Sequence, residues 1–221
     1  MFDFLEGYDL LGAFWVTVQL TVYSALGSLI WGTLLTGMKV SPVPLMRGFA
    51  TAYVNVVRNI PLTVIIVCSS LGLYQTLSIT LNASDSKDIS FRLAVLALIA
   101  YTSAFVCEAL RSGINTVPVG QAEAARALGL SFTQVLRLIV LPQAFRTVVN
   151  PLSNVLIALT KNTTIASAIG VAEASYLMKG MIEAEAQLIL IAAVFALGFI
   201  VLTLPTGLIL GWVSKKVAVK R

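Results

Sequence analysis

A cation, an amide and a hydroxyl follow one another in the fourth apolar run of this chain. Lys161, Asn162 and Thr163 stand there, between the uncharged stretch 147–160 and the one that ends at 172. A Lys near the centre of a bilayer costs about 2.5–3.5 kcal/mol on insertion scales, so such a residue faces the protein interior or water. Lys161 would attract a carboxylate-bearing substrate. Snorkelling, pairing with an acid and helix packing are its alternative roles.

A second cation, Arg58, precedes the uncharged run 59–84, and Pro61 follows it three residues later. A proline inside a helix removes a backbone hydrogen bond and kinks or breaks the helix. Broken helices in transporters tend to line the transport pathway. Arg58 and Pro61 are therefore candidate path residues together with Lys161, Asn162 and Thr163.

The residue types exclude most enzymatic chemistry. The chain contains no His, which rules out Ser-His-Asp and Cys-His catalysis and nearly all transition-metal sites. Cys68 and Cys107 lie singly in apolar runs, outside any CxxC pair. No GxxxxGK[ST] loop is present, so the chain lacks the P-loop that binds ATP. We expect no catalytic residue, no metal ligand and no cofactor in this chain.

The long polar segment 113–146 contains a distinctive helical pattern. Strong helix formers fill 122–128, Pro118 stands near the expected start, and Gly129 suits the left-handed position after a helix. This pattern predicts a short, small-faced helix whose exposed acid is Glu123. Such a helix can enter a groove on another protein closely, although a solvated connector between spans would read similarly.

A second helix is expected directly after this one. Ser131 and Gln134 have the spacing of a capping box, in which the two side chains satisfy each other's backbone N–H groups. The apolar residues that follow continue the helical pattern to Pro142, which we expect to stop or kink it. The segment therefore reads as a helix–glycine–helix element.

The elements that position these residues are membrane spans. Of the 221 residues, 58% are hydrophobic and 11% charged, and the mean hydropathy is +0.92. A spanning helix needs about 20 mostly apolar residues. We expect one transmembrane domain over 1–221, all-α, with five spans near 11–38, 51–78, 91–111, 147–168 and 187–213.

The Lys and Arg residues divide unevenly between the loops. Loops 39–50 and 111–146 and the C-terminal tail hold ten of them, and the remaining loops and the N-terminal tail hold two. The positive-inside rule then predicts a cytoplasmic C-terminus, a cytoplasmic 113–146 loop and an outside N-terminus. The net charge of +5 is thus an orientation signal, and no nucleic-acid partner is expected.

Two helix-surface patterns predict packing. A small residue recurs every fourth position along the first span, which favours close helix approach; the residues are Ser24, Ser28, Gly32 and Thr36. Glu108 and Arg111 are three residues apart, which predicts an ion pair on the surface of the third span.

The 113–146 loop resembles the EAA motif of ABC-importer permeases. The motif is Glu-Ala-Ala, a Gly six residues after the Glu, an Ile ten residues later and then Leu-Pro. The matching residues here are Glu123, Ala124, Ala125, Gly129, Ile139, Leu141 and Pro142.

Further segments resemble the polar amino-acid subfamily of these permeases, and the resemblance covers nearly the whole chain. They are Arg58-Asn59-Ile60-Pro61-Leu62, Arg111-Ser112-Gly113-Ile114, Gly120-Gln121 and Lys161-Asn162-Thr163-Thr164 with Ile169-Gly170. Stretches 101–103, 159–170 and 202–205 look most like glutamate permeases of actinobacterial systems. The departures are Ile60 and Ser112, where the subfamily has Thr and Gly.

The resemblance implies a type I ABC-importer permease in the bacterial cell membrane. Its EAA helix would be the coupling helix, so Glu123, Ala124, Ala125 and Gly129 would transmit ATP-driven motion. The implied partners are two cytoplasmic ABC ATPase subunits, which would bind ATP and Mg²⁺, a second permease subunit of a different chain, and an extracytoplasmic solute-binding protein.

Three other functions remain alternatives at this stage. A permease for another polar amino acid would share these motifs. A membrane-embedded enzyme is disfavoured because the chain has neither His nor a GxSxG motif. A channel or secondary transporter is disfavoured because such transporters are usually built from paired repeats, and five spans without repeats do not provide them.

Overall fold

The computed structural model describes residues 7–81 and 85–217, and its regular elements there are helical. The α-helices are α1 (Leu10–Val40), α2 (Pro44–Asn59), α3 (Leu62–Cys68), α4 (Ser86–Ile114), α5 (Val119–Ala127), α6 (Phe132–Val135), α7 (Leu141–Asn162), α8 (Ala174–Glu185) and α9 (Leu188–Val217). Ser69–Thr76 and Leu136–Val140 are π-helical, and Thr163–Ile169 is a 3₁₀ helix.

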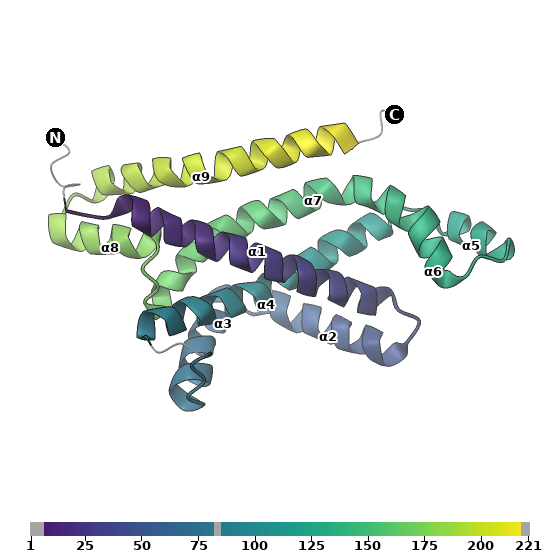
Figure 1. Ribbon diagram of the computed structural model, residues 1–221, viewed down its shortest axis with the longest axis horizontal. Coiled ribbons are helices and arrows are strands. Elements are labelled where there is room, and N and C mark those ends of the chain that lie inside the picture. The colour runs from purple at the N-terminus through teal and green to yellow at the C-terminus, as the bar shows by residue number, and fades with distance from the viewer. Residues whose placement is uncertain (1–6, 82–84, 218–221) are drawn as a thin grey trace.

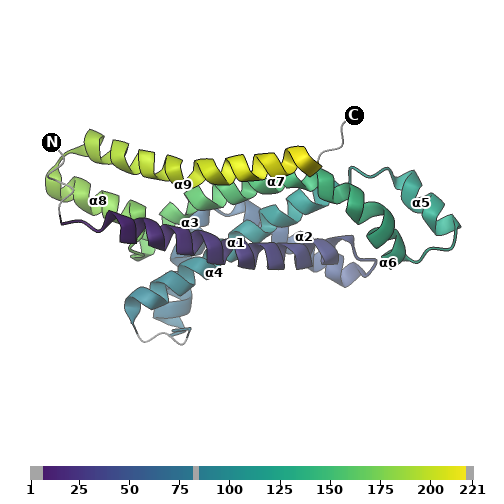
Figure 2. The ribbon, with the colours of Figure 1, turned by 45° about the horizontal axis from the view of Figure 1, so that its top comes forward.

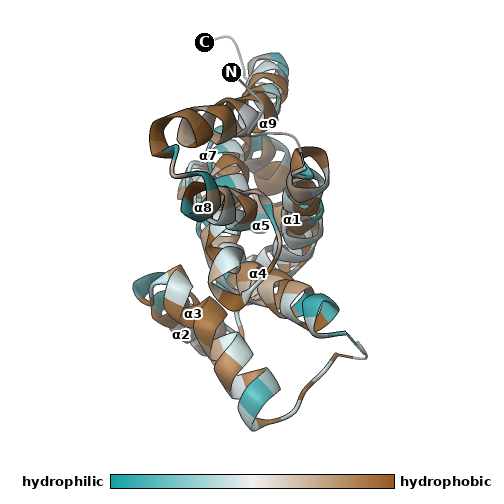
Figure 3. Cartoon of the chain, turned by 90° about the vertical axis from the view of Figure 1, so that its left-hand side faces the viewer, coloured by the Kyte–Doolittle hydropathy of each residue, from teal (hydrophilic) through white to brown (hydrophobic). Residues whose placement is uncertain are grey.

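Three helices are long and apolar enough to cross a bilayer alone within the described residues. They are α1, α4 and α9. Figure 3 views the helices end-on and shows that hydrophobic residues make up much of them. Two bent helix pairs raise the possible number of spans to five. The all-helical expectation is confirmed, and the five predicted spans correspond to α1, α2 with α3, α4, α7 and α9.

The second predicted span is bent by 102° between α2 and the helical run 62–76. Pro61 is the N-cap of α3 with φ −58° and ψ 136°, and the preceding Ile60 is extended. An extended residue before a proline is the conformation that sterics favour, because the proline ring disfavours helical geometry there. The break predicted at Pro61 is therefore confirmed.

Close approach of α1 and α4 forms the centre of the bundle. Ser24, Ser28, Gly32 and Thr36 are all buried, as the small-residue stripe predicted. A Cβ added at Gly32 would lie 2.6 Å from the Cβ of Val106 on α4, which is closer than side chains pack. Glycine is thus required where the two helices come into contact.

Aromatic packing joins α9 to the start of α1. Phe195 is 1% exposed, and its ring stacks on Phe14 with centroids 5.7 Å apart. A Cβ at Gly198 would meet the Phe14 ring at 2.2 Å, so the ring fills the space that this glycine leaves. The contact fixes the last helix against the first.

The two ends of the bundle carry different elements (Figures 1 and 2). α5 and α6 lie at one end, and α8 lies at the opposite end near the start of α1. α1, α4 and α9 run along the long axis between these ends, and the C-terminal end of α9 points toward α5. α5 and α6, which belong to the predicted coupling segment 113–146, therefore lie toward the same end of the bundle as the last helical residues of α9.

Glu173 has a structural role that sequence analysis missed. Its side chain is fully buried and caps α8, accepting hydrogen bonds from the backbone N–H groups of Ser175 at 2.8 Å and Tyr176 at 2.9 Å. Carboxylates at a helix N-terminus satisfy donors that the helix itself cannot. The next residue, Ala174, donates to the Thr17 hydroxyl at 3.1 Å and so ties α8 to α1.

The far end of α8 is also anchored. The Tyr8 hydroxyl donates to Glu185 Oε1 at 3.1 Å. Desolvation and this carboxylate raise the pKa of the Tyr8 phenol above its ordinary value. The phenol therefore stays protonated and keeps its donor throughout the physiological pH range.

Candidate functional site

The coupling segment has the predicted helix–glycine–helix form. α5 begins directly after Pro118 and ends at Ala127, and Gly129 adopts φ +89°. A positive φ is strained for residues with a Cβ, so glycine suits this turn. The capping box is present as predicted, with Ser131 N donating to Gln134 Oε1 at 2.8 Å and Gln134 N donating to Ser131 Oγ at 3.4 Å.

The helix after this turn does not stop at Pro142, so of the two expected effects, a stop or a kink, the structure excludes the stop. The helical path passes from α6 through the π-helical segment Leu136–Val140 into α7, and Pro142 lies in the first turn of α7. Proline has no N–H and fits the first turn of a helix, where that donor would be unpaired. The wider π-helical turn just before it accommodates the change, so the coupling segment continues directly into the fourth span.

The EAA residues separate into an outward face and a buried anchor. Glu123, Ala124 and Gly129 are exposed, whereas Ala125 is 7% exposed. Ala125 packs in an apolar cluster with Val117 and other residues from the connections on both sides of α5; the cluster also includes Val135 and Val140. The first two motif residues are thus available to a partner, and the third fixes α5 to the rest of the chain.

The five predicted path residues, which are Arg58, Pro61, Lys161, Asn162 and Thr163, do not gather in one place. Asn162, the last residue of α7, lines a cavity, whereas Lys161 is exposed outside that lining. Thr163 is buried, and its hydroxyl donates to the carbonyl of Thr160 at 2.7 Å. Pro61 lies at the bend of the second span. The structure therefore assigns Thr163 a helix-stabilising contact and keeps Asn162 as the cavity-facing member of the patch.

The cavity has a volume of about 390 Å³ and lies between α4 and α7. Its walls are Tyr101, Thr102, Phe105, Asn154, Val155, Ala158 and Asn162. Most of this lining is apolar or aromatic with a few polar groups, which is typical of small-molecule sites. The volume is within the range of ligand pockets.

Sequence analysis missed two polar members of this cavity. Thr102 is 2% exposed, and its hydroxyl has no hydrogen-bond partner among the described residues. Asn154 lies in a stretch that the sequence showed only as uncharged. The signal that could have found it is its spacing, because Asn154, Ala158 and Asn162 recur every fourth residue and so share one face of α7.

Arg58 stands next to this cavity. Its guanidinium lies 5.6 Å from the ring centroid of Phe105, a cavity residue, and its Nη1 is 3.6 Å from Oε2 of Glu108. The Arg58 side chain is 43% exposed. The cation–π contact with Phe105 and the Glu108 carboxylate hold the guanidinium in place. A cation is therefore held next to a ring that lines the cavity.

The partner of Glu108 differs from the expectation. Among the described residues Glu108 forms ion pairs with Lys39 and Arg58, and none with Arg111. The Lys39 ammonium donates to Oε1 of Glu108, and the Lys39 side chain is 7% exposed. A buried ammonium needs a compensating charge. The Glu108 carboxylate therefore pairs with Lys39 at the end of α1 and not with Arg111 on its own helix. Glu108 thereby joins α1, α2 and α4.

The chain is similar to membrane components of known transport systems. Residues 11–219 match the family model described as binding-protein-dependent transport system inner membrane component. The chain is 60% identical to the glutamate transport system permease protein GluC of Corynebacterium efficiens, over 97% of this chain and 96% of that protein. It is 32% identical to the probable glutamine ABC transporter permease protein GlnM of Bacillus subtilis, over 98% and 95%.

A solved structure matches at the level of the whole fold. It is a crystal structure of an amino acid ABC transporter with histidines, which superposes with a TM-score of 0.82 at 27% sequence identity. The match covers 94% of this chain and 93% of that chain.

Proposed function

The chain belongs to the family of binding-protein-dependent transport system inner membrane components, and we propose that it is the permease subunit of an ATP-driven importer for glutamate. Members of this family are membrane components of ABC transporters, whose ATPase activity resides in a partner subunit. The observation that carries the proposal is the coupling segment, which presents an acid-bearing small-residue face and continues without interruption into the fourth span.

The coupling role follows from how α5 is held. Glu123 and Ala124 would enter a groove on a cytoplasmic ATPase, because they are exposed and the helix face is small enough for close approach. Ala125 and the apolar cluster around it would transmit the displacement, and Gly129 would preserve the turn. Movement of the ATPase would then reach α7 through packed residues.

The substrate role rests on the cavity between α4 and α7. Asn154, Asn162 and the unpartnered Thr102 hydroxyl offer hydrogen bonds that the amino and carboxylate groups of an amino acid can use. Arg58 beside the cavity and the exposed Lys161 would favour an anionic substrate. The identity of that substrate is taken from the glutamate permease with which this chain shares 60% of its residues.

The proposed assembly contains two cytoplasmic ATPase subunits, which bind ATP and Mg²⁺, a second permease of a different chain and an extracytoplasmic solute-binding protein. The uneven Lys and Arg distribution supports an outside N-terminus and a cytoplasmic C-terminus in a bacterial cell membrane. α5 then faces the cytoplasm, and α8 lies at the outer end.

Uptake by the reconstituted complex tests the proposal. The complete complex is reconstituted in proteoliposomes, and ATP is supplied either inside or outside them. Labelled glutamate should accumulate only when ATP is on the α5 side of the membrane and the binding protein is on the α8 side. Uptake without ATP would instead indicate a channel or secondary transporter.

A permease for glutamine is the second candidate, supported by the 32% identity to a probable glutamine permease. Excess unlabelled glutamine distinguishes the two. It should leave glutamate uptake unchanged if glutamate is the substrate, and it should abolish uptake of label if glutamine is preferred.

A further inference from the structure

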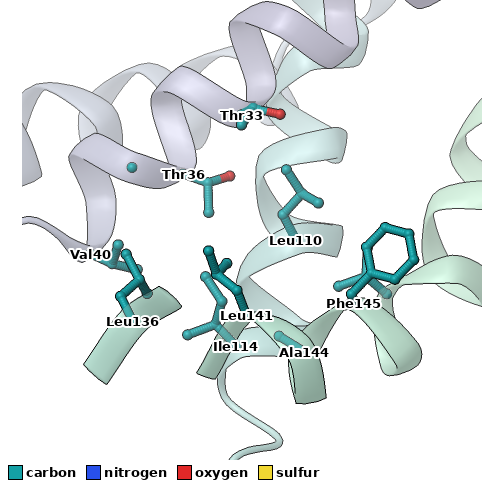
Figure 4. A pocket seen from close by; sticks show the side chains of 11 residues that line it. Thr33, Thr36, Val40, Leu110, Ile114, Leu136, Leu141, Ala144 and Phe145 are labelled. Carbon is teal, nitrogen blue, oxygen red and sulfur yellow. The ribbon is translucent and has the colours of Figure 1, made fainter. Parts of the chain in front are cut away.

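An apolar groove of about 430 Å³ lies where α1, α4 and α7 meet (Figure 4), away from the polar cavity. Its walls include Thr33 and Gly37 of α1, Leu110 and Ile114 of α4, and Leu136 and Leu141 at the junction of the coupling segment with α7. Neither the coupling role nor the substrate path uses this groove.

The groove is suited to an apolar occupant. The hydroxyls that reach it belong to threonines, and both are already satisfied within α1. Thr33 donates to the carbonyl of Leu29 at 2.6 Å, and Thr36 donates to the carbonyl of Gly32 at 2.7 Å. A guest would therefore gain nothing from polar contacts inside the groove, and burial of hydrocarbon would be its source of affinity.

The groove extends to the ends of three helices. Val40 is the last residue of α1, Ile114 the last of α4 and Leu141 the first of α7, and all three line it. These are the helix ends that the basic residues assign to the cytoplasmic side. An occupant thus has its hydrocarbon between the helices and any polar part at the level of lipid headgroups.

Two cations without carboxylate partners stand at this level. Arg111 follows the lining residue Leu110, and Arg137 follows Leu136; both are exposed. Among the described residues neither forms an ion pair, whereas Lys39 is already engaged by Glu108. Both cations are thus next in sequence to lining residues of an apolar groove, although neither is itself part of the lining.

We propose that this groove binds an anionic phospholipid of the cytoplasmic leaflet, with an acyl chain between α1, α4 and α7 and the headgroup phosphate near Arg111 and Arg137. The two cations next to lining residues would select an anionic headgroup, and the apolar volume of about 430 Å³ would accept an acyl chain. The lipid touches Leu136 and Leu141 and so packs directly against the π-helical turn that joins α6 to α7.

Gly37 offers a way to fill the groove without disturbing the bundle. A Cβ added there meets no atom within 4 Å, so a larger side chain can occupy the space reserved for the lipid. The matched control is Gly180 on α8, where an added Cβ also meets nothing and which lies outside the groove.

Native mass spectrometry of the assembled complex titrated with phosphatidylglycerol measures the lipid directly. Gly37→Leu should weaken phosphatidylglycerol binding more than tenfold, because losing two buried methylenes already corresponds to about that factor. Gly180→Leu should bind as the parent does. The same spectra report whether each complex is intact, and Thr33→Phe provides a second groove-filling variant if Gly37→Leu does not assemble. Equal binding by the parent and the groove-filled variants would overturn the proposal.

The charge component has its own test. Arg137→Gln should lower phosphatidylglycerol affinity about fivefold, the effect of one cation near an anionic headgroup, and should leave phosphatidylcholine affinity unchanged. Arg47→Gln on α2, which removes an exposed cation whose neighbours in the chain do not line the groove, is the control. Equal affinity of the parent for the two lipids would refute anionic selection. Both readouts are independent of transport, so they remain decisive if the proposed substrate is wrong.

Discussion

The Gln143 side chain on α7 donates to the side-chain oxygen of Gln121 on α5, with the two atoms 2.7 Å apart. The same Gln143 nitrogen lies 2.9 Å from the carbonyl of Ile139, just before α7. These bonds tie the coupling helix to the fourth span directly, in addition to the apolar cluster around Ala125. They provide a second mechanical connection between the proposed ATPase contact and the membrane.

We expect Gln143→Leu to weaken this connection without affecting ATPase docking. A hydrogen bond contributes about 0.5–1.5 kcal/mol of net stabilising free energy. Its loss should therefore lower the ratio of transported substrate to hydrolysed ATP about two- to tenfold. Gln75→Leu, which changes an exposed glutamine far from α5 in sequence, is the control. An unchanged ratio in Gln143→Leu would show that the apolar cluster alone carries the motion.

The exposed face of the coupling helix predicts a docking defect. Glu123→Lys should reduce co-purification of the ATPase and abolish ATP-driven uptake, because it reverses the charge of the exposed motif acid. Glu183→Lys makes the same change on an exposed acid of α8 and should leave docking intact. Normal uptake and co-purification in Glu123→Lys would contradict the assignment of α5.

Gly129→Val tests the turn by a different mechanism. A β-branched residue at φ +89° costs about 1–3 kcal/mol, so α5 should be displaced from its cluster while the spans insert normally. We expect uptake to be lost with normal membrane insertion, measured by uptake and by quantification of the chain in membranes. Retention of full uptake would show that the turn tolerates a side chain.

The three-helix ion cluster predicts a stability effect. Glu108→Gln leaves the buried Lys39 ammonium without its compensating charge, and breaking a buried pair in this way costs about 3–5 kcal/mol. The thermal midpoint of the detergent-solubilised complex should therefore fall clearly. Arg111→Gln, which removes a cation that forms no ion pair with Glu108, should change it little. Similar losses in both variants would restore the pairing of Glu108 with Arg111.

Lys161 provides the test of the substrate path. If the exposed ammonium attracts the substrate carboxylate, Lys161→Met should raise the half-saturation concentration of uptake about tenfold or more, the effect of losing a hydrogen bond to a charged group. Binding-protein affinity should not change, and Lys87→Met serves as the control lysine. Lower complex stability with an unchanged half-saturation concentration would assign Lys161 a structural role.

The sequence by itself determined the helical class, the approximate positions of the long apolar helices, and the turn at Gly129. These features are local: apolar length predicts a span, and Gly129 and the Ser131–Gln134 pair act within a few residues of the chain. The break at Pro61 belongs with them, since proline acts on its own helix and on the residue before it. The small-residue stripe also succeeded, because its period gives one helix face.

Only the tertiary structure decided which polar residues meet. Glu108 pairs with Lys39 and Arg58 because burial of the Lys39 ammonium demands a counter-charge, and nothing in the spacing of Glu108 and Arg111 reveals that demand. Asn162 joins Asn154 and Thr102 in one cavity only because α4 and α7 pack side by side. Glu173 caps α8 through local hydrogen bonds. Its complete burial depends on the packing of α8 on α1, to which the neighbouring Ala174 is hydrogen-bonded through Thr17, 157 residues away, and local patterns do not reveal such a contact.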